Sequence, residues 1–353
     1  MCTYMTSPSA IKTDLRNLTR QELSVFVENI GLSRFRANQI FSWLFRPGIS
    51  SFEKMTDLSL KLRDSLNSIA AMSELTLARR ENSRDGTVKY AFSLADGNII
   101  ESVLIPDDGR NTLCVSSQVG CAMGCKFCKT GTIGFRRNLL AAEIVNQVRH
   151  VYDELAVTKD SAVHNLVFMG MGEPLANFDN LMKSLDILLD QRGLNFSERK
   201  ITVSTCGIIP KIIELGQKSN VSLALSLHAS SEDVRSRLMP VNDTYSLTSL
   251  LETCKKLPIP KRKRIMIEYV MLAGVNDSVE DAKKLAKILR GIPCKINLLP
   301  FNPCPQIPFQ PTGAEQLERF QDILRKADYT VLVRESRGAD ISAACGQLAG
   351  KKM

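Results

Sequence analysis

Of the 353 residues in the chain, 44% are hydrophobic and 24% are charged, a composition typical of a folded globular protein. The length predicts one large domain with an appendage, or two domains. No apolar run reaches the roughly 18 to 20 residues that a membrane span requires, and the first residues lack the basic start and apolar stretch of a secretory signal, so we expect a cytoplasmic protein with no membrane partner. The formal net charge of +9 favours polyanionic partners such as nucleic acids, although charge alone is equally compatible with a solvating surface.

The beginning of the chain predicts a small helical domain. Apolar residues recur at helical spacing in three segments, and Gly31 and the Pro47-Gly48 pair supply stop signals between them. The expected helices cover 13–30, 35–45 and 58–69.

A β-hairpin is expected next. Residues 88–94 and 99–105 are rich in β-branched and aromatic residues, and they flank Asp96-Gly97, a dipeptide typical of tight hairpin turns. The hairpin would link the helical domain to the rest of the chain.

From Thr112 onward, strands alternate with helices about six times. Strands are expected at 112–117, 164–169, 201–205, 221–227, 265–271, 295–301 and 330–334. Helices are expected to begin near Ala141, Asn177, Pro210, Leu247, Ser278 and Gly313. This alternation predicts an α/β fold, a partial (βα)6 barrel whose ligand-binding groups gather at the carboxyl ends of the strands. The predicted domains are 1–75 (helical accessory), 76–108 (β-hairpin linker) and 109–353 (barrel with a C-terminal loop).

The strongest chemical signal is the CxxxCxxC run of Cys121, Cys125 and Cys128 after the first barrel strand. Three thiolates on one loop can hold three corners of a 4Fe-4S cubane and leave the fourth iron open to a substrate. The alternatives are unreactive thiols or a zinc site, but zinc prefers CxxC pairs and a fourth Cys or His that this loop lacks. Buried, unreactive thiols are expected at Cys2, Cys206, Cys254, Cys294 and Cys304.

This loop, placed after the first strand of a βα barrel, resembles that of the radical S-adenosylmethionine superfamily. In that superfamily the open iron chelates the amino and carboxylate groups of the cofactor, and reduction of the cluster releases a 5'-deoxyadenosyl radical. The resemblance therefore implies two cofactors, a 4Fe-4S cluster and S-adenosylmethionine. The implied cofactor-binding residues, each of which could instead only cap a strand end, are Gly172, Glu173, Ser204, Ser226, Leu227, His228 and Asn302.

Longer segments are similar to the RlmN/Cfr family of bacterial adenosine methyltransferases. The matching segments are TLCVSSQVGCAMGCKFCKTGTIGFRRNL, FMGMGEPLAN, ITVSTCGIIP, LALSLHAS, RLMPVND, YVMLAGVNDS and RGADISAACGQLAG. The resemblance implies methylation of adenine C2 in 23S ribosomal RNA and tRNA. Methylation of C8, as by the Cfr branch that confers ribosomal antibiotic resistance, remains an alternative, although Val119 stands where Cfr has a cysteine. A non-catalytic iron-sulfur RNA-binding factor is a further alternative.

The same resemblance implies three catalytic residues. Adenine C2 is electron-poor, so it cannot attack the methyl group of S-adenosylmethionine directly. By resemblance, Cys345 first takes a methyl group from one cofactor molecule, and a radical from a second molecule activates that methyl group for addition to C2. Cys114 then releases the product by forming a transient disulfide with Cys345, and Glu101 accepts a proton.

The implied partners are RNA and a reductant. The target base must leave its stack to enter a barrel, and the helical domain would read RNA shape beside it. Candidate contacts to the RNA backbone are Arg136-Arg137, Arg199-Lys200 and 261–264. We also expect an electron donor such as flavodoxin, and a monomeric enzyme.

Overall fold

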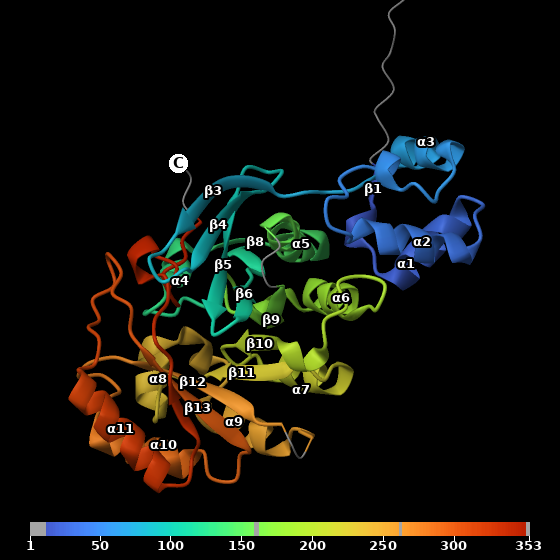
Figure 1. Cartoon of the computed structure of the whole chain (residues 1–353). Helices are drawn as coiled ribbons and strands as arrows, with labels where there is room; N and C mark the ends of the chain where they lie inside the picture. Colours follow the sequence, from blue (N-terminus) through green and yellow to red (C-terminus); the bar gives the residue numbers. More distant parts are fainter. Residues whose placement is uncertain (1–11, 159–161, 261–262, 351–353) are drawn as a thin grey trace, which may run out of the picture.

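The computed structural model describes residues 12–158, 162–260 and 263–350. In Figure 1 a small N-terminal domain (blue) stands beside one large sheet flanked by helices. Lys261 and Arg262, which belong to the predicted basic stretch, lie outside the described residues. Within the described ranges, no helix has both the length and the apolar character needed to cross a bilayer.

Short helices and a parallel strand pair build the N-terminal domain. They are β1 (Thr13–Asp14), η1 (Leu15–Asn17), α1 (Arg20–Asn29), α2 (Arg34–Leu44), η2 (Phe52–Lys54), α3 (Leu60–Ile69) and β2 (Ala70–Ala71). The predicted second and third helices are confirmed. The first helix begins later than predicted, because Asp14 accepts the N–H groups of Arg16 and Ser73 and so favours a strand and turn. Helix α1 starts after Thr19, which forms a reciprocal capping box with Glu22.

One large sheet organises the rest of the described chain. Its strands are β3 (Thr76–Asn82), β4 (Val88–Ser93), β5 (Ile99–Asp107), β6 (Arg110–Cys114), β9 (Val163–Phe168), β10 (Ile201–Thr205), β11 (Ser222–Ser226), β12 (Ile265–Met271), β13 (Cys294–Pro300) and β14 (Val331–Val333). Their order is β14-β13-β12-β11-β10-β9-β6-β5-β4-β3. Pairing is parallel from β6 to β14 and antiparallel from β3 to β6. The parallel strands form the predicted partial barrel, with β14 at one edge of the sheet.

The hairpin predicted around Asp96-Gly97 is present as β4 and β5. Strand β5 also pairs with β6, so the hairpin continues the barrel sheet. Strand β3 was not predicted, because its charged residues outnumber its β-branched and aromatic residues and it lies at the edge of the sheet. The division of the chain into three domains stays a prediction.

Helices follow the parallel strands, as the alternating pattern predicts. They are α5 (Ala141–Thr158), α6 (Phe178–Leu189), α7 (Ile209–Lys218), α8 (Glu232–Leu238), α9 (Leu247–Lys256), α10 (Val279–Ile288) and α11 (Ala314–Lys326). Leu181, Leu185 and Leu188 show the expected apolar face, since all three are buried on one side of α6. The short helix α8 was not predicted. A smaller hairpin of β7 (Gln118–Gly120) and β8 (Phe135–Asn138) brackets α4 (Lys129–Ile133).

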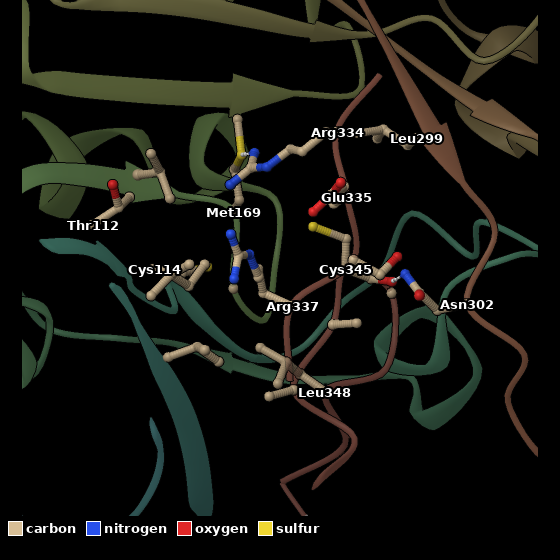
Figure 2. A pocket seen from close by; sticks show the side chains of 18 of the residues that line it. Thr112, Cys114, Met169, Leu299, Asn302, Arg334, Glu335, Arg337, Cys345 and Leu348 are labelled. Carbon is tan, nitrogen blue, oxygen red and sulfur yellow. Dashed lines mark hydrogen bonds between the residues drawn. The ribbon is translucent and has the colours of Figure 1, made fainter. Parts of the chain in front are cut away.

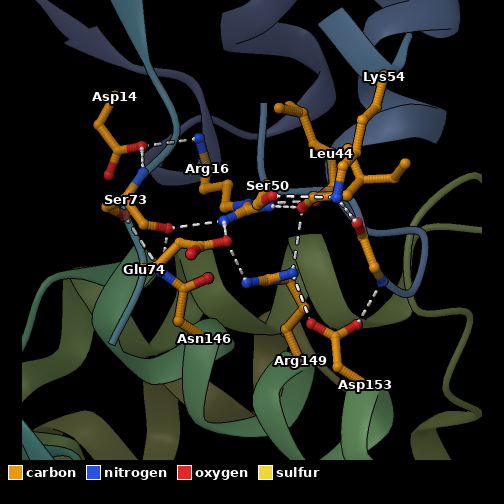
Figure 3. A network of polar contacts seen from close by, with 12 residues as sticks. Asp14, Arg16, Leu44, Ser50, Lys54, Ser73, Glu74, Asn146, Arg149 and Asp153 are labelled. Carbon is orange, nitrogen blue, oxygen red and sulfur yellow. Dashed lines mark hydrogen bonds and ion pairs between the residues drawn. The ribbon is translucent and has the colours of Figure 1, made fainter. Parts of the chain in front are cut away.

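A buried polar network joins the N-terminal domain to α5 (Figure 3). Arg16 is fully buried, and its guanidinium donates to three backbone carbonyl oxygens and to the Glu74 carboxylate at 3.2 Å. Glu74 also accepts from Arg149 of α5 at 2.7 Å, and Arg149 donates to Asp153 at 2.8 Å. Burial, together with the neighbouring Arg149 charge, lowers the pKa of Arg16 to about 10. The domain is therefore attached through charge-assisted hydrogen bonds in which the two guanidinium groups are buried, while the Glu74 side chain is 42% exposed.

Candidate active site

Two adjoining cavities lie at the carboxyl ends of the parallel strands, where barrel enzymes bind their ligands. The first has a volume of about 170 Å³ and is lined by Cys121, Cys125 and Cys128; we call it the cysteine-loop cavity. The second has a volume of about 360 Å³ and is lined by β5, β6 and the C-terminal segment; we call it the hairpin-side cavity (Figure 2). Residues that line both cavities include Cys128, Asn302, Arg334 and Cys345.

Backbone contacts fix the loop that carries the three cysteines. A side chain at Gly120 would come within 1.8 Å of the Gly134 carbonyl oxygen, so only glycine fits where β7 meets the loop. The same carbonyl accepts the N–H of Cys121 at 3.0 Å, and Leu238 of α8 accepts the N–H of Lys126 at 2.9 Å. Anchored in this way, the loop presents its thiols to one cavity.

The three thiols suit an iron-sulfur cluster. Burial raises the pKa of Cys121 to about 12 and also raises the pKa of Cys125 and Cys128. All three residues line the same cavity. In the part of the chain that the structure describes, no three Cys, His, Asp or Glu side chains surround one point as a single metal ion would need. A 4Fe-4S cubane takes each thiolate on a different iron, so a loop with three separate thiols fits it.

The structure brings six of the seven predicted cofactor-binding residues to the cysteine-loop cavity. These six are Gly172, Glu173, Ser204, Ser226, His228 and Asn302. Leu227 is fully buried and does not line this cavity; its N–H donates to the Glu268 carbonyl at 3.0 Å. The role of these residues in cofactor binding stays a prediction.

Glu173 is a buried carboxylate at the wall of this cavity. It accepts the N–H groups of Leu175 at 3.0 Å and of Cys206 at 2.8 Å, while burial raises its pKa. The preceding Gly172 has a φ of +101°, and a side chain there would come within 2.5 Å of Gln118. A cation such as an ammonium group would offset the cost of keeping this carboxylate charged.

His228 is held rigidly after β11. Its backbone has a φ of +57°, its Nδ1 accepts the Val270 N–H at 3.0 Å, and its ring meets the Phe127 ring edge-on with centroids 4.7 Å apart. Burial lowers its pKa to about 3, and the Arg235 charge contributes. The imidazole is therefore neutral, and Nε2 remains the nitrogen that can contact a ligand in the cavity.

Cys114 and Cys345 come from distant parts of the chain and line the same hairpin-side cavity (Figure 2). Cys345 is exposed, whereas Cys114 at the end of β6 is 8% exposed. Burial, together with the Cys345 thiol, raises the pKa of Cys114 to about 12, and Arg334 opposes the shift. In Figure 2 the Arg337 side chain projects into the space between the two cysteines. Both cysteines are free thiols, and their transient disulfide stays a prediction.

Glu101 itself lines neither cavity, whereas Val103 on the same strand lines the hairpin-side cavity. It is 3% exposed, and its Oε2 accepts the N–H groups of Ala349 at 2.8 Å and Gly350 at 3.2 Å. Its Oε1 lies 3.8 Å from Nη2 of Arg79. The predicted proton acceptor is thus held against the segment that follows Cys345.

Sequence reasoning missed three residues of the site. Cys206 was expected to be a buried, unreactive thiol; it is buried, but it lines the cysteine-loop cavity together with Glu268 and Arg334. Burial raises the pKa of Glu268, while Arg334 and the hydrogen bond that Asn297 donates at 3.0 Å oppose the shift. Cys206 and Arg334 directly follow strands, so the strand-end argument applied to Ser204 could have found them. Glu268 lies inside β12 and carries no such signal.

Two of the predicted basic stretches lie at the amino ends of the parallel strands, away from the ends that carry the two cavities. Arg199-Lys200 precedes β10 and Arg264 precedes β12, so both are at the amino ends of parallel strands. Arg137 is on the same side as the cysteine loop, but it is paired with Asp96 and Glu143. RNA contacts by these stretches stay predictions.

Comparisons with known proteins agree with this arrangement. A family model described as Ribosomal RNA large subunit methyltransferase N-terminal domain matches residues 13–72, and the Radical SAM superfamily model matches residues 115–286. The dual-specificity RNA methyltransferase RlmN of Desulfotalea psychrophila is 51% identical over 96% of this chain and 95% of its own length. The protein of the same name from Geobacter sulfurreducens is 52% identical over 96% of this chain and 92% of its own length.

A solved structure shows the same fold. The crystal structure of a radical SAM methyltransferase from Sphaerobacter thermophilus is 42% identical, with a TM-score of 0.91, and the match covers 96% of this chain and all of that chain. Membership of the radical SAM superfamily implies a 4Fe-4S cluster and S-adenosylmethionine as cofactors, which the three-thiol loop fits. With relatives this similar along nearly its whole length, the chain belongs to the RlmN family of radical SAM RNA methyltransferases.

Proposed function

We propose that this enzyme methylates C2 of an adenosine in 23S ribosomal RNA and in tRNA, through a methyl group carried on Cys345. The observation that carries the proposal is that Cys345 lines both cavities. One sulfur thus faces the side where the cysteine loop lies and the side where Cys114 lies. The names of the relatives favour this activity over a Cfr-like C8 methyltransferase and over a non-catalytic iron-sulfur RNA-binding factor.

Residues of the cysteine-loop cavity would bind the cofactors. Cys121, Cys125 and Cys128 would hold the cluster, while Glu173 would bind the cofactor ammonium group. When bound, the cluster and S-adenosylmethionine supply a methyl group and a carbon-centred radical. Cys345 would accept the methyl group on its sulfur, and Arg334 lies in the same cavity wall.

The hairpin-side cavity would receive the adenosine. After the methyl carbon has bonded to C2, the base is attached to Cys345, and the C2 proton and one electron must leave. Glu101 is the proposed acceptor of the proton, and the oxidised cluster would supply the acceptor of the electron. The Cys114 thiolate would then bond to the Cys345 sulfur while the bond from that sulfur to the methyl carbon breaks, and the electron pair goes to the departing carbon. That carbon takes up a proton, and the two cysteines are left as a disulfide.

The remaining partners follow from the proposed chemistry. Cluster reduction requires a one-electron donor, for which we propose a flavodoxin, and disulfide reduction requires a thiol reductant. Because ribosomal RNA and tRNA are in the cytoplasm, we propose a cytoplasmic enzyme, acting as a monomer because one chain supplies both cavities.

Nucleoside mass spectrometry tests the proposal. Reconstituted enzyme with S-adenosylmethionine, a reductant and either 23S ribosomal RNA or tRNA should yield 2-methyladenosine from both RNAs, and the Cys345→Ala variant should yield none. Formation of 8-methyladenosine, or turnover by Cys345→Ala, would contradict the assignment.

A further inference from the structure

We infer that Glu101 is a positioning residue for the Cys345 loop: its carboxylate clamps the backbone just beyond Cys345 and so determines where the sulfur stands between the two cavities. The inference depends on the proposed function only for what the Cys345 sulfur does. The clamp itself is a property of the fold and can be tested without catalysis.

The contact has the geometry of an anion bound by consecutive amides. Oε2 of Glu101 accepts the Ala349 N–H at 2.8 Å and the Gly350 N–H at 3.2 Å. The Glu101 side chain is 4% exposed, so water competes little for these bonds. Hydrogen bonds to a charged acceptor are stronger than those between neutral groups, and they are stronger still when buried.

Strand β5 also presents its backbone to this segment. Gly350 has a φ of +54°, and a side chain there would come within 2.4 Å of the Ile99 carbonyl oxygen. The chain thus lies directly on the start of β5, two residues before Glu101. The Glu101 backbone is fixed as well, since the Ser116 hydroxyl donates to its carbonyl oxygen at 2.6 Å.

Other contacts secure the chain between Cys345 and the clamp. Asn302 donates to the Cys345 carbonyl at 3.3 Å, the Lys129 N–H donates to Gly346 at 2.7 Å, and the Thr130 hydroxyl donates to Leu348 at 2.8 Å. These contacts come from the barrel rim and from α4, next to the cysteine loop. Glu101 adds a contact from a carboxylate on the hairpin strand β5.

Clamping and proton acceptance make different demands on residue 101. The proposed role as proton acceptor requires an ionisable side chain at this position. A clamp needs only a hydrogen-bond acceptor, which the Gln side-chain oxygen also supplies. Glu101→Gln therefore keeps the clamp and removes the base, whereas Glu101→Ala removes both.

Amide hydrogen exchange on the reconstituted full chain tests the clamp directly, through the exchange rates of the Ala349 and Gly350 amides. In Glu101→Ala, the amides of Ala349 and Gly350 should exchange on the order of tenfold faster or more, because a buried charge-assisted bond is lost. Glu101→Gln should stay within about threefold of the unaltered protein. The control is Arg79→Ala, which removes the ion-pair partner 3.8 Å away and leaves both amide bonds in place, so exchange should change little.

A second readout follows the sulfur. Methylation of Cys345 in the absence of RNA, measured by peptide mass spectrometry, should slow on the order of tenfold in Glu101→Ala and recover in Glu101→Gln. Iron content confirms that each variant has kept its cluster. Exchange at Ala349 and Gly350 that is unaltered in Glu101→Ala, or equally fast in Glu101→Gln and Glu101→Ala, would overturn the clamp. An enzyme that methylates no RNA while showing the expected exchange pattern would instead contradict only the proposed function.

Discussion

The attachment of the N-terminal domain and the attachment of the Cys345 loop are built in contrasting ways. The first depends on Arg16, which is fully buried and bonded on all sides, and on Arg149 from α5. The second depends on backbone contacts around Cys345, itself exposed, and on one carboxylate. Loss of the Arg16 guanidinium would leave several buried carbonyl oxygens without a donor at once, whereas each contact of the loop can be removed singly. The N-terminal domain is therefore attached through one shared network, and the Cys345 loop through separate contacts.

The largest expected effect comes from a variant in which the proposed reaction stops before product release. Cys114→Ala should abolish product release and accumulate a covalent protein-RNA adduct, because in the proposed mechanism the cluster, the cofactor and Cys345 build the adduct and only its release needs a second thiol. Denaturing electrophoresis before and after nuclease digestion detects the adduct.

Two variants control this experiment. Cys345→Ala, alone or combined with Cys114→Ala, should form no adduct, and Cys294→Ala, at the opposite end of a barrel strand, should turn over normally. A Cys114→Ala enzyme that retains its iron and forms no nuclease-sensitive adduct would rule out the release role.

The next largest effect is expected for the network that attaches the N-terminal domain. Arg16→Ala should lower the free energy of unfolding by about 3 to 5 kcal/mol, because it strands the buried partners of a fully buried guanidinium. Urea unfolding measures this loss. Arg63→Ala is a matched control, since Arg63 also donates to three backbone carbonyls but lies within the N-terminal domain and is partly exposed, and it should cost about 1 kcal/mol. Equal losses of unfolding free energy in Arg16→Ala and Arg63→Ala would contradict a special role for the buried Arg16 network.

Alkylation should separate the two reactive cysteines by their surroundings. At pH 8 iodoacetamide should modify Cys345 on the order of 100-fold faster than Cys114, because Cys345 is exposed and burial raises the pKa of Cys114 to about 12. Below that pKa the thiolate fraction of Cys114 grows with pH, so its alkylation should accelerate about tenfold per pH unit as long as the fold persists. Peptide mass spectrometry gives both rates, and similar rates at pH 8 would contradict the buried, neutral thiol.

The smallest effect tests a single contact of the loop. Thr130→Val removes the hydroxyl that donates to Leu348 at 2.8 Å and keeps the shape of the side chain, so we expect a loss of about 1 kcal/mol in unfolding free energy. Thr132→Val, which removes a comparable hydroxyl bond to Lys129 at an exposed position, serves as the control and should cost less. A larger loss of unfolding free energy in Thr132→Val would contradict a stabilising role for the contact between Thr130 and Leu348.

Sequence patterns predict the parts of this molecule that repeat or cluster. The βα alternation predicts the sheet, and the spacing of Cys121, Cys125 and Cys128 predicts the loop that lines a cavity. Strand β1 escaped prediction because a side-chain contact of Asp14 with a residue far along the chain overrides the local helical spacing. The partners of Glu101 escaped for the same reason, since nothing near Glu101 in the sequence indicates Ala349.

The open edge of the sheet has a consequence for access. The segment after β14 leaves one edge of the sheet and binds the hairpin strands, where Asp85 accepts the Gly338 N–H at 2.9 Å and Glu101 accepts from Ala349. This segment therefore acts as a strap across the unclosed side of the barrel (Figure 1). Cys345 lies on the strap. A macromolecule that enters from this side and displaces the strap must therefore also displace the Cys345 sulfur, so substrate entry and the position of the sulfur are coupled.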